Sequence, residues 1–295
     1  MPTDKQNILI NNNISLYYEE YGSGPLDANN IILSGQVGFY PKGMQQHLAT
    51  LGFHVFCLTL RGFHPSTLVE EDYGEHWYDV FADDLAAFAD KMGIKKFTYM
   101  GASHGAGVGW HLMLRHAERI HAFIAVVPGP HSLAEGTMSY RQMLAQGIIK
   151  EIPPFNPPID DDPARQLRRN RRTEHIKNLP PAPELERKVD YGRPLMYLKS
   201  EEKLCQALRK IQTPVLIIGG TDDPISTPEL MMRTAKNLPH CKLVLYSNCG
   251  HDIDTDLIEE CCDVAARFIK NALKTGKWYL PVQEPAVQEA EGEGQ

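Results

Sequence analysis

The sequence predicts an α/β fold, with helices on both faces of a mainly parallel sheet. Short apolar runs recur along the 295 residues as ISLYYEE, NIILSG, HVFCLTL, KFTYMG, AFIAVVP, PVLIIGG and KLVLYS. Helical patterns lie between several of these runs. Near-continuous Val, Ile and Leu runs that alternate with helices are typical of parallel strands that are buried on both faces. A chain of this length can bury a sizeable core.

Three segments have helical patterns with recognisable ends. WYDVFADDLAAFADKMG places apolar residues at helical spacing and stops at Gly93. TPELMMRTAKNLPH begins at Thr227, a candidate N-cap that is followed by a proline. DLIEECCDVAARFIKNALKTG is amphipathic and ends at Gly276. We expect the apolar faces of these helices to pack on the sheet.

The stretch from 129 to 212 breaks this alternation. It contains EIPPFNPPIDDDP, RQLRRNRR and LPPAPELERK but no convincing buried strand. Because prolines this dense exclude a long regular helix, we expect a lid of short helices, inserted into a core of residues 1–128 and 213–277. The acidic residues 278–295 include few apolar side chains, and we expect them to be disordered.

The composition excludes several classes of partner. The formal net charge of -7 and the pI near 5.9 argue against general nucleic-acid binding and against charge-driven binding to anionic lipid. The start, MPTDKQNILI, has no signal-peptide pattern, and no apolar stretch approaches the ~18 residues of a membrane span. We therefore expect a cytoplasmic protein that acts on a small-molecule substrate, without a nucleic-acid or membrane partner. An oligomer is left open.

The cysteines predict neither a disulfide framework nor a metal site. The six cysteines follow no framework spacing, and the pattern from Cys241 to Cys249-Gly-His251 lacks a paired C-x-x-C. We therefore expect a reducing compartment, no bound metal and no cofactor.

The motif GASHG, from Gly101 to Gly105, lies between an apolar run and a helix rich in small residues. At such a junction, G-x-S-x-G holds a serine on a sharp, strained turn with its hydroxyl above the sheet. Side chains at 101 and 105 would collide with the flanking strand and helix. We interpret Ser103 as a nucleophile; the alternative is a glycine-rich turn with a structural serine.

A serine nucleophile needs a base to remove its proton and a carboxylate to orient that base. Asp222 and Asp223 follow one apolar run and His251 follows the next, so all three lie at the carboxyl ends of predicted strands, where sites in open α/β sheets are found. We favour Asp223 because Pro224 keeps it extended. Asp222 is then a turn-forming or capping neighbour. His251 follows the serine and the acid in the chain order that this architecture requires.

Other histidines compete with His251 for the role of the base. His104 is adjacent to the serine, but successive side chains at a tight turn diverge. His111 is expected on a helix surface, while His64 and His131 are candidates for lining the pocket.

Preorganised backbone N–H groups must stabilise the oxyanion of the reaction. We expect one from His104, directly after the nucleophile, and one from Gln36 in the loop SGQVG, where Gly35 lets the chain turn. For Gln36 the alternative is an ordinary surface loop. Phe39 and Tyr40, just past this loop, are candidates for the pocket wall.

A basic run, RQLRRNRR, follows the acidic DDDP in the expected lid. We favour a solvated helix face with local Asp–Arg pairs. The alternative is an arginine that reaches inward to bind a substrate carboxylate. The residues concerned are Arg165, Arg168, Arg169, Arg171 and Arg172.

The chain resembles the α/β-hydrolase superfamily, specifically its lid-bearing esterases, lactonases, haloperoxidase-like proteins and carbon–carbon bond hydrolases. The motifs that resemble this family are SGQVG (34–38), LTLRGFHPST (58–67), GASHG (101–105), HAERIHAFIAV (116–126), GGTDDP (219–224) and GH (250–251). The resemblance implies an eight-stranded α/β-hydrolase sheet, a serine triad and a pocket roofed by the lid. The sequence departs from the family pattern at Ser34, where histidine is usual, at Thr59, where aspartate is usual, and at His64, where glycine is usual.

The expected function is hydrolysis of a small, largely apolar carboxylic ester or lactone through an acyl-enzyme, with Ser103, His251 and Asp223 as the catalytic triad. Two alternatives stay open. One is carbon–carbon bond hydrolysis or cofactor-free oxygenation, because SHG at the turn also resembles the cofactor-free dioxygenases of this fold. The other is a ligand receptor that retains the triad.

Overall fold

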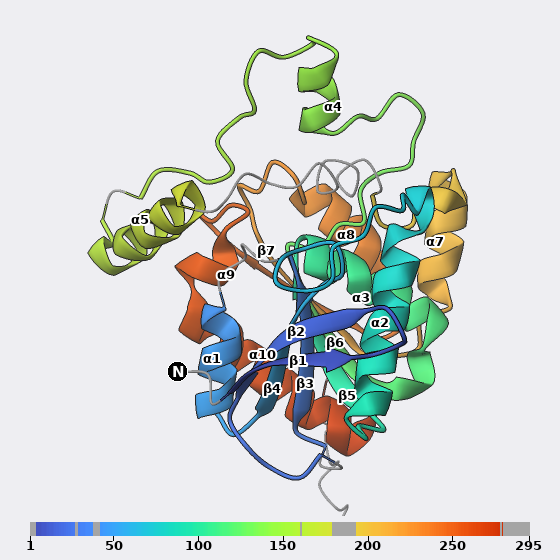
Figure 1. The fold of residues 1–295 in the computed structure, drawn as a ribbon. Helices are drawn as coiled ribbons and strands as arrows, with labels where there is room; N and C mark the ends of the chain where they lie inside the picture. The colour runs from blue at the N-terminus through green and yellow to red at the C-terminus, as the bar shows by residue number, and fades with distance from the viewer. Residues whose placement is uncertain are drawn as a thin grey trace, which may run out of the picture.

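The centre of the molecule is a mixed sheet between two layers of helices (Figure 1). The computed structural model describes residues 4–26, 29–37, 42–159, 161–178, 193–277 and 279. Within them the sheet has eight strands in the order β1-β2-β4-β3-β5-β6-β7-β8. Strand β2 pairs antiparallel with β1 and β4. All the other pairings, from β4–β3 to β7–β8, are parallel. The predicted fold class is confirmed.

The predicted apolar runs correspond to strands β2 to β8. Strand β1, with the sequence DKQNIL, has no such run; it lies at one edge of the sheet with β2 as its neighbour. The strands are β1 (Asp4–Leu9), β2 (Ser15–Tyr21), β3 (Ile31–Gln36), β4 (His54–Thr59), β5 (Phe97–Ala102), β6 (Ile120–Val126), β7 (Val215–Gly220) and β8 (Cys241–Tyr246).

Helices cover both faces of the sheet, as the alternating pattern predicts. One apolar cluster joins the sheet to α2, α3, α7 and α8, and a second joins the opposite face to α1 and α10. The bounds of these helices are α1 (Gly43–Thr50), α2 (Trp77–Lys91), α3 (His104–Arg115), α7 (Glu201–Arg209), α8 (Pro228–Lys236) and α10 (Ile258–Thr275). Short 3₁₀ turns are η1 (Gly74–His76), η2 (Ala117–Arg119) and η3 (Met196–Leu198).

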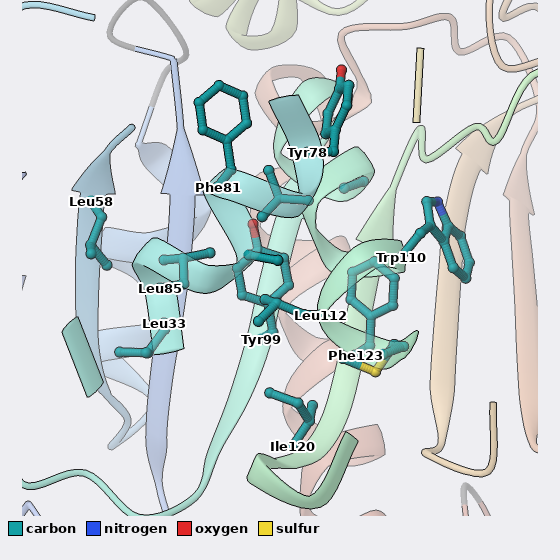
Figure 2. Packing of buried hydrophobic residues seen from close by; sticks show 14 of the residues in the cluster. Leu33, Leu58, Tyr78, Phe81, Leu85, Tyr99, Trp110, Leu112, Ile120 and Phe123 are labelled. Atoms are coloured by element: carbon teal, nitrogen blue, oxygen red, sulfur yellow. The ribbon is translucent and has the colours of Figure 1, made fainter. Parts of the chain in front are cut away.

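Large aromatic side chains fix α3 against the sheet. Figure 2 shows Trp110 of α3 next to Phe123 of β6, with ring centroids 4.9 Å apart and planes at 81°. Both side chains are fully buried, and Trp110 Nε1 donates a hydrogen bond to Pro128 O at 2.9 Å. Edge-to-face contacts of this kind add to the stabilisation from burial. The start of α3, which holds the serine turn, is therefore rigidly placed over the sheet.

The segment between β6 and β7 contains α4 (Tyr140–Ala145), α5 (Pro163–Lys177), η3 and α7. The expectation of short helices alone is wrong for α5, which has 15 residues. Its prolines come before the helix, and Pro163 lies in the first turn, where it is tolerated. In addition, the Asp162 side chain caps the helix by accepting a bond from the Arg165 N–H at 2.9 Å. Figure 1 shows α5 beside α9 (Ile253–Asp256).

Some predictions fall outside the described residues. These concern Gly38, Phe39 and Tyr40 after β3, the run LPPAPELERK, and the tail from residue 280 onward. In the described part of the chain, none of the helices combines the length and the apolar character that a membrane crossing needs.

Candidate active site

Ser103 occupies the sharp turn that the sequence predicts between β5 and α3. Its φ of 51° and ψ of -112° put a non-glycine residue in a rarely populated backbone region. The turn is held by a bond from the Ser103 N–H to Val126 O at 2.9 Å and by one from the Gly107 N–H to Ser103 O at 3.0 Å. The strained conformation is therefore fixed by the neighbouring strand and by the first turn of the helix.

The two glycines of GASHG are required by close backbone contacts. A Cβ on Gly101 would lie 2.3 Å from the carbonyl group of Gly105, and a Cβ on Gly105 would lie 2.5 Å from Gly35 O. The hydroxyl of Tyr99 donates to Gly105 O at 2.7 Å and stabilises the same turn. The prediction that small residues are needed at 101 and 105 is confirmed.

The structure brings Ser103, His251 and Asp223 into one hydrogen-bonded chain. His251 Nε2 lies 2.9 Å from Ser103 Oγ, and His251 Nδ1 lies 2.8 Å from Asp223 Oδ2. The other carboxylate oxygen, Oδ1, accepts bonds from the N–H groups of Ile225 at 2.8 Å and Ser226 at 3.0 Å. Asp223 and His251 are both buried. This arrangement orients the imidazole for proton transfer with the serine hydroxyl.

The loop that carries His251 is clamped by the segment after β6. The His251 N–H donates to Phe155 O at 2.9 Å, and a Cβ on Gly250 would lie 2.2 Å from that same oxygen. The Phe155 ring also contacts the imidazole, with ring centroids 6.0 Å apart. The glycine before the histidine therefore permits a close approach of two loops, and this approach positions the imidazole.

Asp222, the alternative acid, is exposed and does not contact His251. Its carboxylate accepts a bond from Thr221 Oγ1 at 2.7 Å, while its N–H donates to Cys249 O at 2.9 Å. Asp222 thus belongs to the turn after β7, as the favoured interpretation predicts.

The two residues predicted to line the oxyanion hole flank the serine turn. His104 is the first residue of α3, and its Nδ1 lies 2.9 Å from Tyr78 Oη. Gln36 is the last residue of β3 and is buried, so the surface-loop alternative is wrong. Among the described residues, neither polar side-chain atom of Gln36 has a hydrogen-bond partner. The use of the two backbone N–H groups as oxyanion donors stays a prediction.

His111 is buried, so the prediction of a surface position is wrong. Its Nδ1 lies 2.8 Å from Asp79 Oδ1, and its Nε2 accepts a bond from the Leu195 N–H at 3.0 Å. Burial lowers the pKa of His111, against the opposing effect of Asp79. The imidazole also stacks on Tyr78, at 5.5 Å between centroids, and so supports the residue that contacts His104. No sequence pattern indicates this pairing, because it depends on how α2 packs against α3.

The arginines of α5 bind α9 and do not form a solvated face. Asp256, which is fully buried, pairs with Arg165 at 2.9 Å and also with Arg169. Arg172 Nη1 donates to Asp252 Oδ2 at 2.8 Å. Arg168 and Arg171 complete the run; Arg168 donates to the Asp256 carbonyl at 2.6 Å and Arg171 is exposed. In the described structure these arginines form long-range pairs, in place of the expected local ones with DDDP, and the pairs attach α5 to the loop after His251.

A cavity of about 490 Å³ lies over the serine turn and is lined by Ser103, His104 and His251. Its other walls come from the end of β6, the loop after β7 and the segment from His131 to Ile176. His131 lines the cavity, as predicted, whereas the exposed His64 does not. The apolar residues that line it are Val127, Met138, Met143, Ile152, Phe155, Ile176, Ile225 and Leu230. The cavity can therefore hold a largely apolar small molecule against the serine hydroxyl.

The chain belongs to the alpha/beta hydrolase fold family, whose model matches residues 31–253. Rat (Rattus norvegicus) bifunctional epoxide hydrolase 2 is 21% identical over 317 residues, which cover 90% of this chain and 55% of that protein. The chain thus spans about half the length of this relative. The bifunctional esterase/perhydrolase DCH of Acinetobacter calcoaceticus is 25% identical over 247 residues, covering 75% of this chain and 83% of that protein.

Solved structures show the same fold. A thermophilic esterase from Thermogutta terrifontis has a TM-score of 0.70 at 19% sequence identity, covering 92% of this chain and 99% of that chain. Identity this low shows a common fold, whereas the reaction must be argued from the site.

Proposed function

We propose that the protein is a serine hydrolase that cleaves a small, largely apolar carboxylic ester or lactone through an acyl-enzyme. The observation that supports this proposal is the buried chain from Asp223 through His251 to Ser103 at the wall of the cavity. A serine hydroxyl becomes a useful nucleophile when a base that can take its proton is held in place by a carboxylate.

In the proposed reaction Ser103 Oγ attacks the substrate carbonyl while His251 Nε2 takes the hydroxyl proton. Asp223 stabilises the resulting imidazolium and holds its orientation. The N–H groups of His104 and Gln36 stabilise the negative charge on the carbonyl oxygen. His251 then gives its proton to the leaving alcohol, which leaves an acyl group on Ser103. A water molecule, deprotonated by His251, cleaves this second ester.

The rat relative is named an epoxide hydrolase, but a serine nucleophile favours ester cleavage over epoxide opening. An alkoxide of Ser103 that opened an epoxide would form an ether, and a histidine base does not activate water to cleave an ether. Attack on an ester instead leaves an acyl-enzyme, which the same base can hydrolyse. The serine is therefore suited to a substrate with an acyl carbon.

We also propose that residues 129–212 form the lid over the core made by residues 1–128 and 213–277. Residues of this segment line the same cavity as Ser103 and His251. Leu204 and Leu208 of α7 lie in the core cluster and would anchor the end of the lid to the sheet.

The test is the variant Ser103→Ala with p-nitrophenyl esters and lactones, together with labelling by a fluorophosphonate. We expect loss of ester turnover and of labelling, with an unchanged circular dichroism spectrum. Unchanged ester hydrolysis in this variant would refute the assignment. Oxygen uptake that persists in the variant would favour cofactor-free oxygenation. Negligible turnover of the wild-type protein, with a large ligand-induced rise in Tm, would favour a receptor.

A further inference from the structure

Among the described residues, the lining of the cavity has an excess of positive charge. The described residues that line it include Arg172 and Arg193 but no aspartate or glutamate. Arg172 is neutralised by Asp252, whose Oδ2 lies 2.8 Å from Arg172 Nη1. The charge of Arg193 is not neutralised by this pair.

Arg193 has a neutral partner in place of a counter-ion. Its Nη2 donates to the amide oxygen Oε1 of Gln142 at 2.7 Å, and this oxygen also accepts a bond from the Ser139 N–H at 2.9 Å. No carboxylate in the described part of the chain pairs with Arg193. Burial lowers the pKa of this guanidinium, and no acidic group among the described residues opposes the effect. A half-buried cation without a counter-ion is costly unless an anion binds there.

The backbone that follows Arg193 is anchored, and the guanidinium itself is held by its bond to Gln142. The N–H of Leu195 donates to His111 Nε2 at 3.0 Å, and the Leu195 side chain is fully buried. His111 in turn is held by Asp79 of α2. A network that involves two core helices therefore fixes the chain two residues beyond Arg193, and ligand binding requires less ordering of this segment.

We propose that Arg193 binds a carboxylate on the substrate, so that the substrates are largely apolar esters or lactones that carry one carboxylate away from the scissile bond. This inference rests on the proposed function. The planar guanidinium matches a carboxylate with two parallel N–H donors, and its donors other than Nη2 have no protein partner in the described structure.

The neighbouring imidazole does not compete for the anion. His131 lines the same cavity, close to Arg193 and His251, and its burial lowers its pKa to about 3. His131 is thus neutral at the pH of an ester assay, and the described lining of the cavity presents its uncompensated charge at Arg193.

The experiment compares two esters of equal chain length, mono-p-nitrophenyl adipate and p-nitrophenyl hexanoate, in which a carboxylate replaces a terminal methyl. The measured quantity is the ratio of kcat/KM for the anionic ester to kcat/KM for the neutral one. We expect Arg193→Met to lower this ratio by ~10- to 100-fold, because a hydrogen-bonded charge is lost, mainly through a higher KM for the adipate ester. Arg193→Lys keeps the charge without the fork, so its ratio should be intermediate.

Arg171→Met is the matched control, since Arg171 is exposed on α5 and does not line the cavity. Its ratio should equal that of the wild-type protein. Circular dichroism melting of each variant checks that it is folded. The proposal would be overturned if Arg193→Met lowered kcat/KM equally for both esters. It would also be overturned if Arg171→Met lowered the ratio as much as Arg193→Met does.

A binding measurement separates this proposal from the proposed function. In the Ser103→Ala background, which needs no turnover, calorimetry with monomethyl adipate should show binding that is ~10-fold or more weaker when Arg193→Met is added. If neither ester is hydrolysed by the wild-type protein but this difference is found, the ester-hydrolase function fails and the carboxylate site stands. If monomethyl adipate binds equally well to Ser103→Ala with and without Arg193→Met, the proposed carboxylate site is wrong.

Discussion

The carboxylate of Asp223 lies 2.8 Å from His251 Nδ1 and receives two further backbone N–H bonds through its other oxygen. This geometry fixes the imidazole with its Nε2 directed to Ser103 Oγ. The neighbouring Asp222 has a carboxylate of the same charge, only one residue away, that does not contact the imidazole. A substitution of Asp222 is therefore a matched control for a substitution of Asp223.

We predict that Asp223→Asn lowers kcat for ester hydrolysis by about 10⁴-fold, because an amide does not stabilise the imidazolium and favours the wrong tautomer. Asp222→Asn should leave kcat within about twofold, since this carboxylate lies in a turn. Steady-state kinetics with p-nitrophenyl esters measure both. A larger loss of kcat in Asp222→Asn than in Asp223→Asn would identify Asp222 as the acid of the triad.

A second prediction concerns the buried carboxylate that holds α5. Asp256→Asn removes the negative charge that pairs with Arg165 and Arg169, so these guanidinium groups lose their counter-ion. We expect the free energy of unfolding to fall by about 3–5 kcal/mol, as measured by urea denaturation. Glu259→Gln is the comparison, because Glu259 is 56% exposed and lies 3.9 Å from Arg168. That variant should lose less than about 1 kcal/mol. Equal losses would show that burial of the pair is unimportant.

A third prediction concerns pH and His131, whose pKa is lowered to about 3, mainly by burial in the cavity and next by the charge of Arg193. In the unfolded chain the pKa returns to about 6.5. Between these values the unfolded state binds more protons than the native state, so this group destabilises the fold progressively as pH falls from about 6.5 to about 3. The slope is up to about 1.4 kcal/mol per pH unit.

His131→Gln removes this contribution, so its free energy of unfolding should depend less steeply on pH over that window. Urea denaturation at a series of pH values measures the slope. His175→Gln is the control, because His175 is exposed near the end of α5. The same slope in His131→Gln as in the wild-type protein would show that His131 titrates normally.

The strands and the positions of the candidate site residues could be predicted because they depend on local sequence. Apolar runs identify buried strands, and Ser103, Asp223 and His251 each follow such a run. Strand ends of a parallel sheet meet at one edge, so chain order alone places these residues near one another. Even the choice between Asp222 and Asp223 followed from a local cause, the proline at 224.

The contacts that could not be predicted join elements whose packing has no local signal. The pair of Asp79 with His111 needs α2 and α3 at a particular rotation, and Asp256 meets Arg169 across 87 residues of sequence. Strand β1 could not be predicted because its sequence, DKQNIL, has no apolar run, and its pairing with β2 is seen only in the structure. Arg193 shows no pattern in the sequence, since its significance depends on the absence of a paired carboxylate among the described residues around it.

The attachment of α5 to α9 has a consequence for how a ligand reaches the serine. Arg172 and Ile176 of α5 line the cavity, while Arg172 also holds Asp252, the residue directly after His251. A displacement of α5 would therefore pull on Asp252, the residue next to His251. The packing of α5 on α9 and the alignment of His251 Nε2 with Ser103 Oγ are therefore coupled, and we expect a bulky molecule that displaces α5 to disturb that hydrogen bond.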